Sequence, residues 1–158
     1  MKPLINLDEL ELEHSASGSF EQKYGLIAEK IGARKLGYNL TIVPPGKKSV
    51  PFHNHHNNEE MFFILEGTGT LRFGAGEHAV RENDVIACPP GGPEVAHQFI
   101  NTGKVDLKYL AVSTMESVEV AEFPDSKKIV CSVGREWPRK IRHVTRHDQA
   151  VDYMDGEE

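Results

Sequence analysis

The residues with the clearest chemical potential lie in one short segment, between Gly46 and Gly67. This segment contains His53, His55 and Glu60. Successive side chains of a strand alternate between its two faces, so His53 and His55 point to the same side. A carboxylate that follows a few residues later can complete one face of an octahedral coordination sphere. The spacing therefore predicts most of a divalent metal site.

A further histidine, His97, follows the turn-rich segment 89–96. We expect it to be a fourth ligand, contributed by a distant strand. Three imidazoles and one carboxylate leave two positions free on an octahedral ion, where water or a bidentate substrate can bind. Nitrogen and oxygen ligands without thiolate admit Mn, Fe, Co, Ni, Cu or Zn, and the residues do not choose among these metals.

Glu59 lies beside Glu60 and competes with it for the role of the acidic ligand. Strand alternation selects Glu60, because this choice also directs Phe62 and Ile64 into the interior. Met61, Phe63 and Leu65, which are large and apolar, then face outward. A second layer must cover them, and either a homodimer, the natural inference, or the chain's own N-terminal segment would serve.

The elements that must position these residues are short strands separated by turns. The pattern predicts strands over residues 36–43, 61–65, 68–73, 78–81, 85–88, 95–100 and 105–113. Residues 66–67 and 74–76 carry the chemistry of hairpin turns. Strands at this close and even spacing indicate an all-β sandwich or barrel rather than alternating β and α units.

The two ends of the chain are less regular. Residues 20–31 place apolar side chains at helical spacing, but two glycines interrupt the pattern, so a short helix and an extra edge strand are equally favoured. We expect residues 1–35 to form an N-terminal extension that packs on the barrel, residues 36–115 to form the barrel, and residues 116–158 to form a C-terminal extension. In the last of these, residues 118–123 and 128–133 are predicted strands and residues 148–158 a polar tail.

The composition is that of one ordinary globular domain. The 158 residues are 39% hydrophobic and 27% charged, and the formal net charge of −6 argues against a nucleic-acid-binding face. Two cysteines do not make a disulfide framework, and the acidic segment 8–13 interrupts any secretory signal. No apolar run approaches the ~20 residues that a membrane helix needs. We therefore expect a soluble, cytoplasmic protein that binds no nucleic acid and no membrane.

Two segments resemble the conserved motifs of the cupin superfamily. The first motif is matched over residues 46–67 and the second over residues 90–101. The resemblance carries over four metal ligands: His53, His55, Glu60 and His97. It implies a double-stranded β-helix, that is, a jelly-roll barrel of two packed antiparallel sheets with short extensions at both ends. The chain is also similar to a bacterial branch of small cupins labelled sugar phosphate isomerase-like.

This chain departs from the usual cupin pattern in two places. Asn83 stands where a glycine usually precedes Asp84, and asparagine tolerates the positive φ that this turn requires. The loop before His97 is longer than the usual proline-glycine turn.

The pocket beside the ion is predicted to be mostly apolar and aromatic, with a few polar side chains. The candidates for its lining are Phe62, Ile64, Phe73, Phe99, Tyr38, Asn39 and Tyr109. Tyr38 and Asn39 are adjacent in a predicted strand, so at most one of them points inward. None of the candidates is a lysine or an arginine, which weakens the case for a phosphorylated sugar.

The same fold and ligands serve several reactions, so they do not define one. We expect a metal-dependent protein that acts on a small oxygen-rich molecule, such as a sugar, a sugar phosphate or a hydroxy or keto acid, with isomerase-like or dioxygenase-like chemistry. An isomerase needs a general base near a metal-bound hydroxy-carbonyl group, whereas a dioxygenase needs redox-active iron and an apolar pocket. The alternative is a non-catalytic binding or sensing protein. A purely structural metal is a third option, which open coordination positions would count against.

Overall fold

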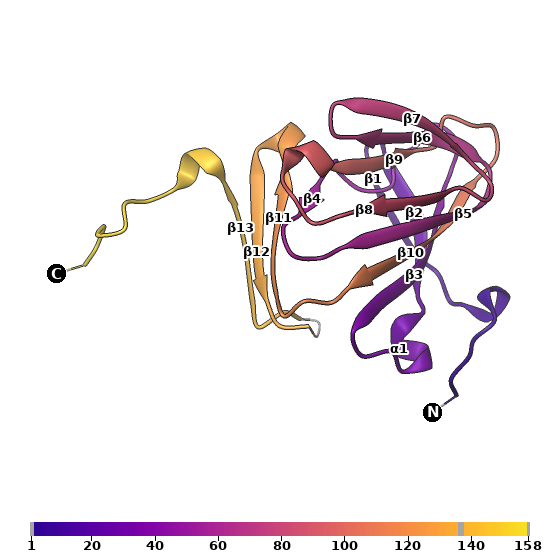
Figure 1. Ribbon diagram of the computed structural model, residues 1–158, viewed down its shortest axis with the longest axis horizontal. Helices are drawn as coiled ribbons and strands as arrows, with labels where there is room; N and C mark the ends of the chain where they lie inside the picture. Colours follow the sequence, from indigo (N-terminus) through magenta and orange to yellow (C-terminus); the bar gives the residue numbers. More distant parts are fainter. Residues whose placement is uncertain (1, 136–137, 158) are drawn as a thin grey trace.

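Short antiparallel strands make up most of the described chain, which comprises residues 2–135 and 138–157 of a computed structural model. The largest sheet consists, in spatial order, of β1 (Glu13–Ser17), β2 (Phe20–Leu26), β3 (Leu36–Val43), β10 (Leu107–Thr114), β5 (Glu60–Glu66) and β8 (Val85–Cys88). A second sheet consists of β7 (Gly76–Arg81), β6 (Thr68–Phe73) and β9 (His97–Ile100). Figure 1 shows the two sheets as the opposed walls of one barrel.

Side chains from both sheets fill the interior of the barrel. One buried cluster joins Ile64 of β5, Leu71 of β6, Val80 of β7, Phe99 of β9 and Leu107 of β10. Inner faces that interdigitate in this way form the walls of a β-sandwich or jelly roll. The all-β, double-stranded β-helix expected from the sequence is therefore confirmed.

Strand β5 has the alternation that its sequence predicts. Phe62 is 6% exposed and Ile64 is fully buried, whereas Met61 and Phe63 on the other face are 48% and 37% exposed. Glu60 begins the strand with the inward parity of Phe62 and Ile64. The carboxylate of Glu60 is thus held by a strand whose register is fixed by burial.

The outer face of the large sheet is covered only in part. Leu10 and Ile27, from the N-terminal region, pack in a cluster that includes Leu110 of β10 and the outward side chains of β3. The chain's own N-terminal segment is therefore one cover for this face. The cover stops short of the outer edge of the sheet, where the exposed apolar side chains are Met61, Phe63 and Val85.

The hairpin expected at residues 66–67 does not form. Strand β5 pairs with β8 and β10, whereas β6 pairs with β7 and β9, so Gly67 carries the chain from one sheet to the other. Gly67 has a φ of +85°, and a Cβ at this position would collide with the backbone oxygen of Asp106. Only glycine permits this crossing. The turn at residues 74–75 does form a hairpin, between β6 and β7.

The N-terminal region contains both of the elements that its spacing left open. Strands β1 and β2 form an edge hairpin on the large sheet, and α1 (Ala28–Ile31) follows β2. Gly25 lies in β2 beneath Leu10, where a Cβ would come within 2.7 Å of the Leu10 Cγ atom. The glycine that interrupts the helical pattern thus makes room for the N-terminal cover.

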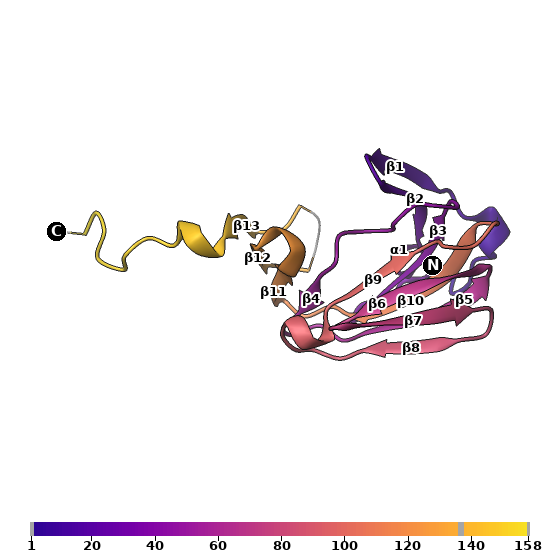
Figure 2. The same ribbon diagram turned by 90° about the horizontal axis from the view of Figure 1, so that it is seen from above.

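A third sheet holds the C-terminal extension. It consists, in spatial order, of β13 (Ile141–Arg146), β12 (Lys128–Val133), β11 (Val118–Phe123) and β4 (Asn54–His55). Figures 1 and 2 show this sheet and the tail beyond it projecting from one end of the barrel. Because β4 belongs to this sheet, His55 is paired with Ala121 of the extension. Within the described residues, no helix has the length and apolar composition needed to span a membrane.

Candidate metal centre

His53 and His97 lie side by side because their backbones pair. The His53 N–H donates to the His97 carbonyl at 3.2 Å, and the His97 N–H donates to the His53 carbonyl at 2.8 Å. Such a pair directs both side chains to one face of the sheet, and the two ring centroids are 4.7 Å apart. The long loop before His97 folds into a 3-10 turn, η2 (Pro93–Val95), and leaves His97 only 3% exposed in the interior.

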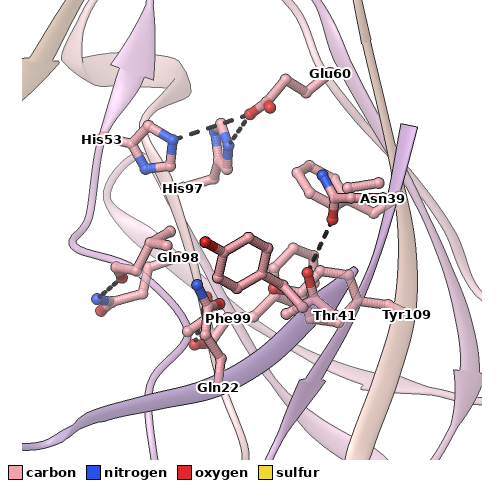
Figure 3. Close-up of a pocket in the computed structure, with 14 residues that line it drawn as sticks. Gln22, Asn39, Thr41, His53, Glu60, His97, Gln98, Phe99 and Tyr109 are labelled. Carbon is pink, nitrogen blue, oxygen red and sulfur yellow. Dashed lines mark hydrogen bonds and ion pairs between the residues drawn. The ribbon is translucent and has the colours of Figure 1, made fainter. Parts of the chain in front are cut away.

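The three histidines surround one oxygen of Glu60. The Nε2 atoms of His97, His55 and His53 lie 2.9, 3.4 and 4.0 Å from Glu60 Oε2. Figure 3 shows His53, His97 and Glu60 gathered at one end of a pocket. Four side chains from three separate strand segments therefore converge on one point.

The spacing of the donor atoms fits a transition-metal ion for three of these residues and is wider for the fourth. Ligands about 2.1 Å from an ion are about 3 Å apart when they are neighbours in an octahedron. Donor atoms of His53, Glu60 and His97 all lie within 4.8 Å of one another. The ring of His55 is 6.4 Å from that of His97, so His55 is near Glu60 but at the edge of the cluster. The set of imidazole nitrogens and one carboxylate suits borderline divalent metals.

Backbone carbonyls orient two of the rings. The Nδ1 atom of His53 lies 2.8 Å from the Pro51 oxygen, and the Nδ1 atom of His97 lies 3.3 Å from the Val95 oxygen. A ring that donates its Nδ1–H to a carbonyl presents the Nε2 lone pair on its other side. Both rings can therefore offer Nε2 to an ion at the centre of the cluster.

The protonation states also suit metal binding. Burial lowers the pKa of His53 to about 4, assisted by the nearby charges of His97 and His55, so this ring is neutral near pH 7. Burial alone would raise the pKa of Glu60, but hydrogen bonding with His55 and His97 outweighs it and holds that pKa well below its usual range. The cluster thus presents an ionised carboxylate and an imidazole that needs no deprotonation.

Glu119, a buried acid on β11, supports the site from behind His55. Its carboxylate accepts the backbone N–H groups of His56, Asn57 and Asn58 at 3.1, 3.3 and 2.7 Å. Its Oε2 atom is also 3.9 Å from His55 Nδ1, a buried nitrogen for which the described residues supply no hydrogen-bond partner. The sequence interpretation missed Glu119; the available signal was an acidic residue at an inward position of a predicted strand.

A pocket of about 190 Å³ adjoins the cluster. Of the candidates from the sequence, the structure places Asn39, Phe62, Phe99 and Tyr109 in its lining. Ile64 and Phe73 pack in the barrel core without lining the pocket. Tyr38 is on the opposite face of β3, in the cluster under the N-terminal cover, because its neighbour Asn39 takes the inward position.

The pocket is more polar than the sequence suggested. Five further polar side chains line it: Gln22, Tyr24, Thr41, Ser49 and Gln98. Gln22 and Tyr24 belong to β2, which the sequence interpretation placed in an extension outside the barrel. No local pattern identifies them, because their position depends on the pairing of β2 with β3.

Comparison with known proteins agrees with this architecture. Residues 39–113 match a family model described as the cupin domain. An oxalate-binding protein from Thermotoga maritima is 34% identical over 60% of this chain and 75% of its own length. An uncharacterized protein from Methanocaldococcus jannaschii is 36% identical over 51% of this chain; the match spans 65% of that protein, less than two thirds of it.

A solved structure extends the similarity to nearly the whole chain. The crystal structure of a sugar phosphate isomerase of the cupin superfamily, from Silicibacter pomeroyi, superposes with a TM-score of 0.78 and is 26% identical, covering 97% of this chain and 98% of that one. The chain belongs to the cupin superfamily.

Proposed function

We propose that this cupin holds one divalent transition metal through His53, His55, Glu60 and His97, and that the ion binds a small oxygen-rich organic molecule. The observation that carries the proposal is the convergence of three Nε2 atoms on Glu60 Oε2 at the end of a pocket. An ion at this point would act as a Lewis acid on a chelated carboxylate, hydroxyl or carbonyl group.

The size of the pocket supports a small ligand. A volume of about 190 Å³ corresponds to roughly six water molecules at about 30 Å³ each. Hydroxy acids, keto acids and small sugars fit this limit. The relative from Thermotoga maritima is named for oxalate, a small chelating acid, and that name supports the same class of ligand here.

The ionisable side chains of the pocket bear on the type of reaction. Among the described lining residues, the only ionisable groups apart from the proposed ligands are Tyr24 and Tyr109. Burial raises the pKa of Tyr109 to about 12, and a hydrogen bond to Glu13 raises the pKa of Tyr24. Both phenols are protonated near pH 7, so they can donate hydrogen bonds but cannot act as general bases.

This lining favours dioxygenase-like chemistry over isomerase-like chemistry, because an isomerase needs a side chain that removes a proton from the substrate. The same observation favours a second candidate function, a binding or sensing protein in which the ligand is held without turnover. We keep the enzyme as the first proposal, since metal-dependent oxidation requires no protein base.

Metal content tests the ligand assignment. We expect the His55→Ala variant to bind metal at least roughly tenfold more weakly, the lower limit for the loss of a site partner, while its circular dichroism keeps the β signature. His78 is exposed on β7, so His78→Ala is the matched control. Unchanged metal stoichiometry and affinity in both His55→Ala and His53→Ala would contradict the proposal.

Turnover separates the two candidate functions. Protein loaded anaerobically with Fe(II), and separately with Mn(II) or Zn(II), is mixed with lactate, oxalate or an unphosphorylated sugar, and both heat of binding and product formation are measured. Oxygen-dependent product with Fe(II) supports the enzyme. Saturable binding without product under any of the metals supports the binding protein.

A further inference from the structure

We infer that the pocket selects an unphosphorylated ligand, whose remote end carries hydroxyl or carbonyl groups, and that Gln22 recognises this end. The inference rests on the proposed function, since the ion holds the other end of the ligand. It names the substrate class of the site and a specificity-determining residue outside the segment 39–113 that matches the family model.

The lining of the pocket carries no positive charge from lysine or arginine among the described residues. Apart from the proposed metal ligands, the polar lining residues are Gln22, Tyr24, Asn39, Thr41, Ser49, Gln98 and Tyr109. A phosphate that enters such a site loses its hydration without gaining a cationic partner, which is costly. The hydroxyl and carbonyl groups of an unphosphorylated ligand can instead form hydrogen bonds with the neutral polar side chains of the lining.

Two cations that contact residues in or next to the pocket lining are already paired. Lys47 lies 3.2 Å from Glu21, and Arg72 contacts Asp125 at 2.8 Å and donates to the side-chain oxygen of Gln98 at 3.1 Å. Recruiting either cation for a phosphate would break an existing ion pair. The described lining residues therefore supply no cation for a phosphate, and these two neighbouring cations are engaged elsewhere.

Two amide side chains of the lining, Gln22 and Asn39, have polar groups available to a ligand. Within residues 2–135 and 138–157, the amide of Gln22 has no hydrogen-bond partner, although the residue is half-buried against the pocket. Thr41 donates to Asn39 Oδ1 at 3.0 Å, which leaves the Asn39 amide hydrogens free. A partly buried amide without partners is satisfied by water or by a ligand. Gln22 can both donate to and accept from a hydroxyl group.

Gln22 also lies where the remote end of a chelated ligand would reach. Figure 3 shows Gln22 at the end of the pocket away from Glu60, so a ligand chelated at the metal cluster points its remote end toward β2. Tyr24 lies two residues along the same strand and lines the same pocket, with its hydroxyl 2.5 Å from Glu13 of β1. The β1–β2 hairpin thus forms the wall that meets the remote end of the ligand.

Three acids test the inference on the metal-loaded protein. Lactate has only the chelating hydroxy-acid group, D-erythronate adds two hydroxyl groups, and 4-phospho-D-erythronate adds a phosphate to the same carbon chain. By isothermal titration calorimetry, we expect erythronate to bind roughly fivefold more tightly than lactate, the gain of about one neutral hydrogen bond. We expect 4-phosphoerythronate to bind at least roughly tenfold more weakly than erythronate, because its charge is unpaired.

Variants at position 22 locate the effect. Gln22→Leu should remove the preference for erythronate over lactate while leaving the metal content unchanged. Gln22→Lys should instead strengthen the binding of 4-phosphoerythronate several-fold. Lys23 is the exposed neighbour on the other face of β2, so Lys23→Gln is the control and should behave like the natural protein.

The outcomes separate the two proposals. If the loaded protein does not bind lactate, chelation by the ion fails and both proposals fall. If lactate binds but 4-phosphoerythronate binds as tightly as erythronate, only the inference about the pocket is overturned. The same conclusion follows if Gln22→Leu keeps the full preference for erythronate.

Discussion

Glu119 shows at the scale of single residues how a carboxylate outside the ligand set can control the site. It satisfies three consecutive backbone N–H groups directly after His55, and its oxygen is 3.9 Å from the outer nitrogen of that ring. Partners behind metal-bound histidines orient the ring and tune its basicity. The position of His55 at the edge of the cluster makes it the proposed ligand most dependent on such support.

We expect Glu119→Ala to weaken metal binding about tenfold or more and to lower the free energy of unfolding, because the backbone N–H groups of Asn57 and Asn58 lose their acceptor. Glu119→Gln keeps one acceptor oxygen and should be intermediate in both measurements. Competition with a fluorescent chelator gives the affinity, and urea denaturation gives the stability. The exposed Glu116 provides the control Glu116→Ala; an unchanged metal affinity in Glu119→Ala would show that the contact serves the loop alone.

Tyr109 provides a second prediction at this scale, in alkaline solution. Burial raises the pKa of its phenol to about 12, from a usual value of 10.0. Between these two values the unfolded chain has released the proton and the folded chain retains it, so stability falls as the pH rises. The loss amounts to about 3 kcal/mol, at about 1.4 kcal/mol per pH unit.

The Tyr109→Phe variant should lack this loss. Urea denaturation at pH 9 and pH 11 measures the part of this loss that develops by pH 11, about 1.4 kcal/mol, as the difference between the natural protein and the variant. The highest step in the ultraviolet titration of the tyrosines should disappear with the same substitution. A variant that loses stability as steeply as the natural protein would show that Tyr109 titrates normally.

At the scale of elements, the N-terminal segment acts as part of the barrel wall. Leu10 is 7% exposed and packs with Ile27 and Leu40 over the outer face of β3. The covered strand β3 pairs with β2, and β2 carries Gln22, which lines the pocket. Loss of the cover should therefore affect both stability and ligand selection.

We expect Leu10→Ala to lower the free energy of unfolding by about 2–5 kcal/mol, the usual range for a buried leucine. Leu4 is 60% exposed, so Leu4→Ala should change stability by less than about 0.5 kcal/mol. Both are measured by urea denaturation of the metal-free protein. Equal effects of the two substitutions would mean that the N-terminal cover is not fixed on the barrel in solution.

At the scale of the whole molecule, the uncovered part of the large sheet predicts self-association. The outward side chains Met61, Phe63 and Val85 are 48%, 37% and 66% exposed, and the register places Phe63 directly opposite Val85. A contiguous apolar strip on a sheet edge is typical of a protein interface. The homodimer expected from the sequence stays a prediction, now with a defined surface.

We expect Val85→Glu to convert the dimer into a monomer, because the charge would be buried without a partner at the interface. Sedimentation velocity and light scattering measure the mass. Val151, exposed in the tail, gives the control Val151→Glu, which should remain dimeric. A natural protein that is monomeric at all accessible concentrations would refute the prediction.

Several features of this protein follow from local sequence alone. Strand alternation placed His53 and His55 on one face and separated Phe62 from Met61, because the side-chain period of a strand does not depend on the rest of the fold. The closely spaced turns also predicted the all-β class, because turn chemistry is local. The positions of Pro, Gly and Asn mark where the backbone must reverse, whatever it later packs against.

Other features were decided only by the tertiary structure. The link at Gly67 has the composition of a hairpin turn but crosses between sheets, because β5 finds its partners in β8 and β10. Gln22 and Glu119 reach the site from opposite ends of the chain, through the pairing of β2 with β3 and of β11 with β4. Pairings between distant segments depend on the burial of whole faces, so no local pattern specifies them. The cluster of His53, Glu60 and His97 and part of the pocket lining could therefore be predicted from the sequence, whereas the β2 wall of the pocket and the contact behind His55 could not.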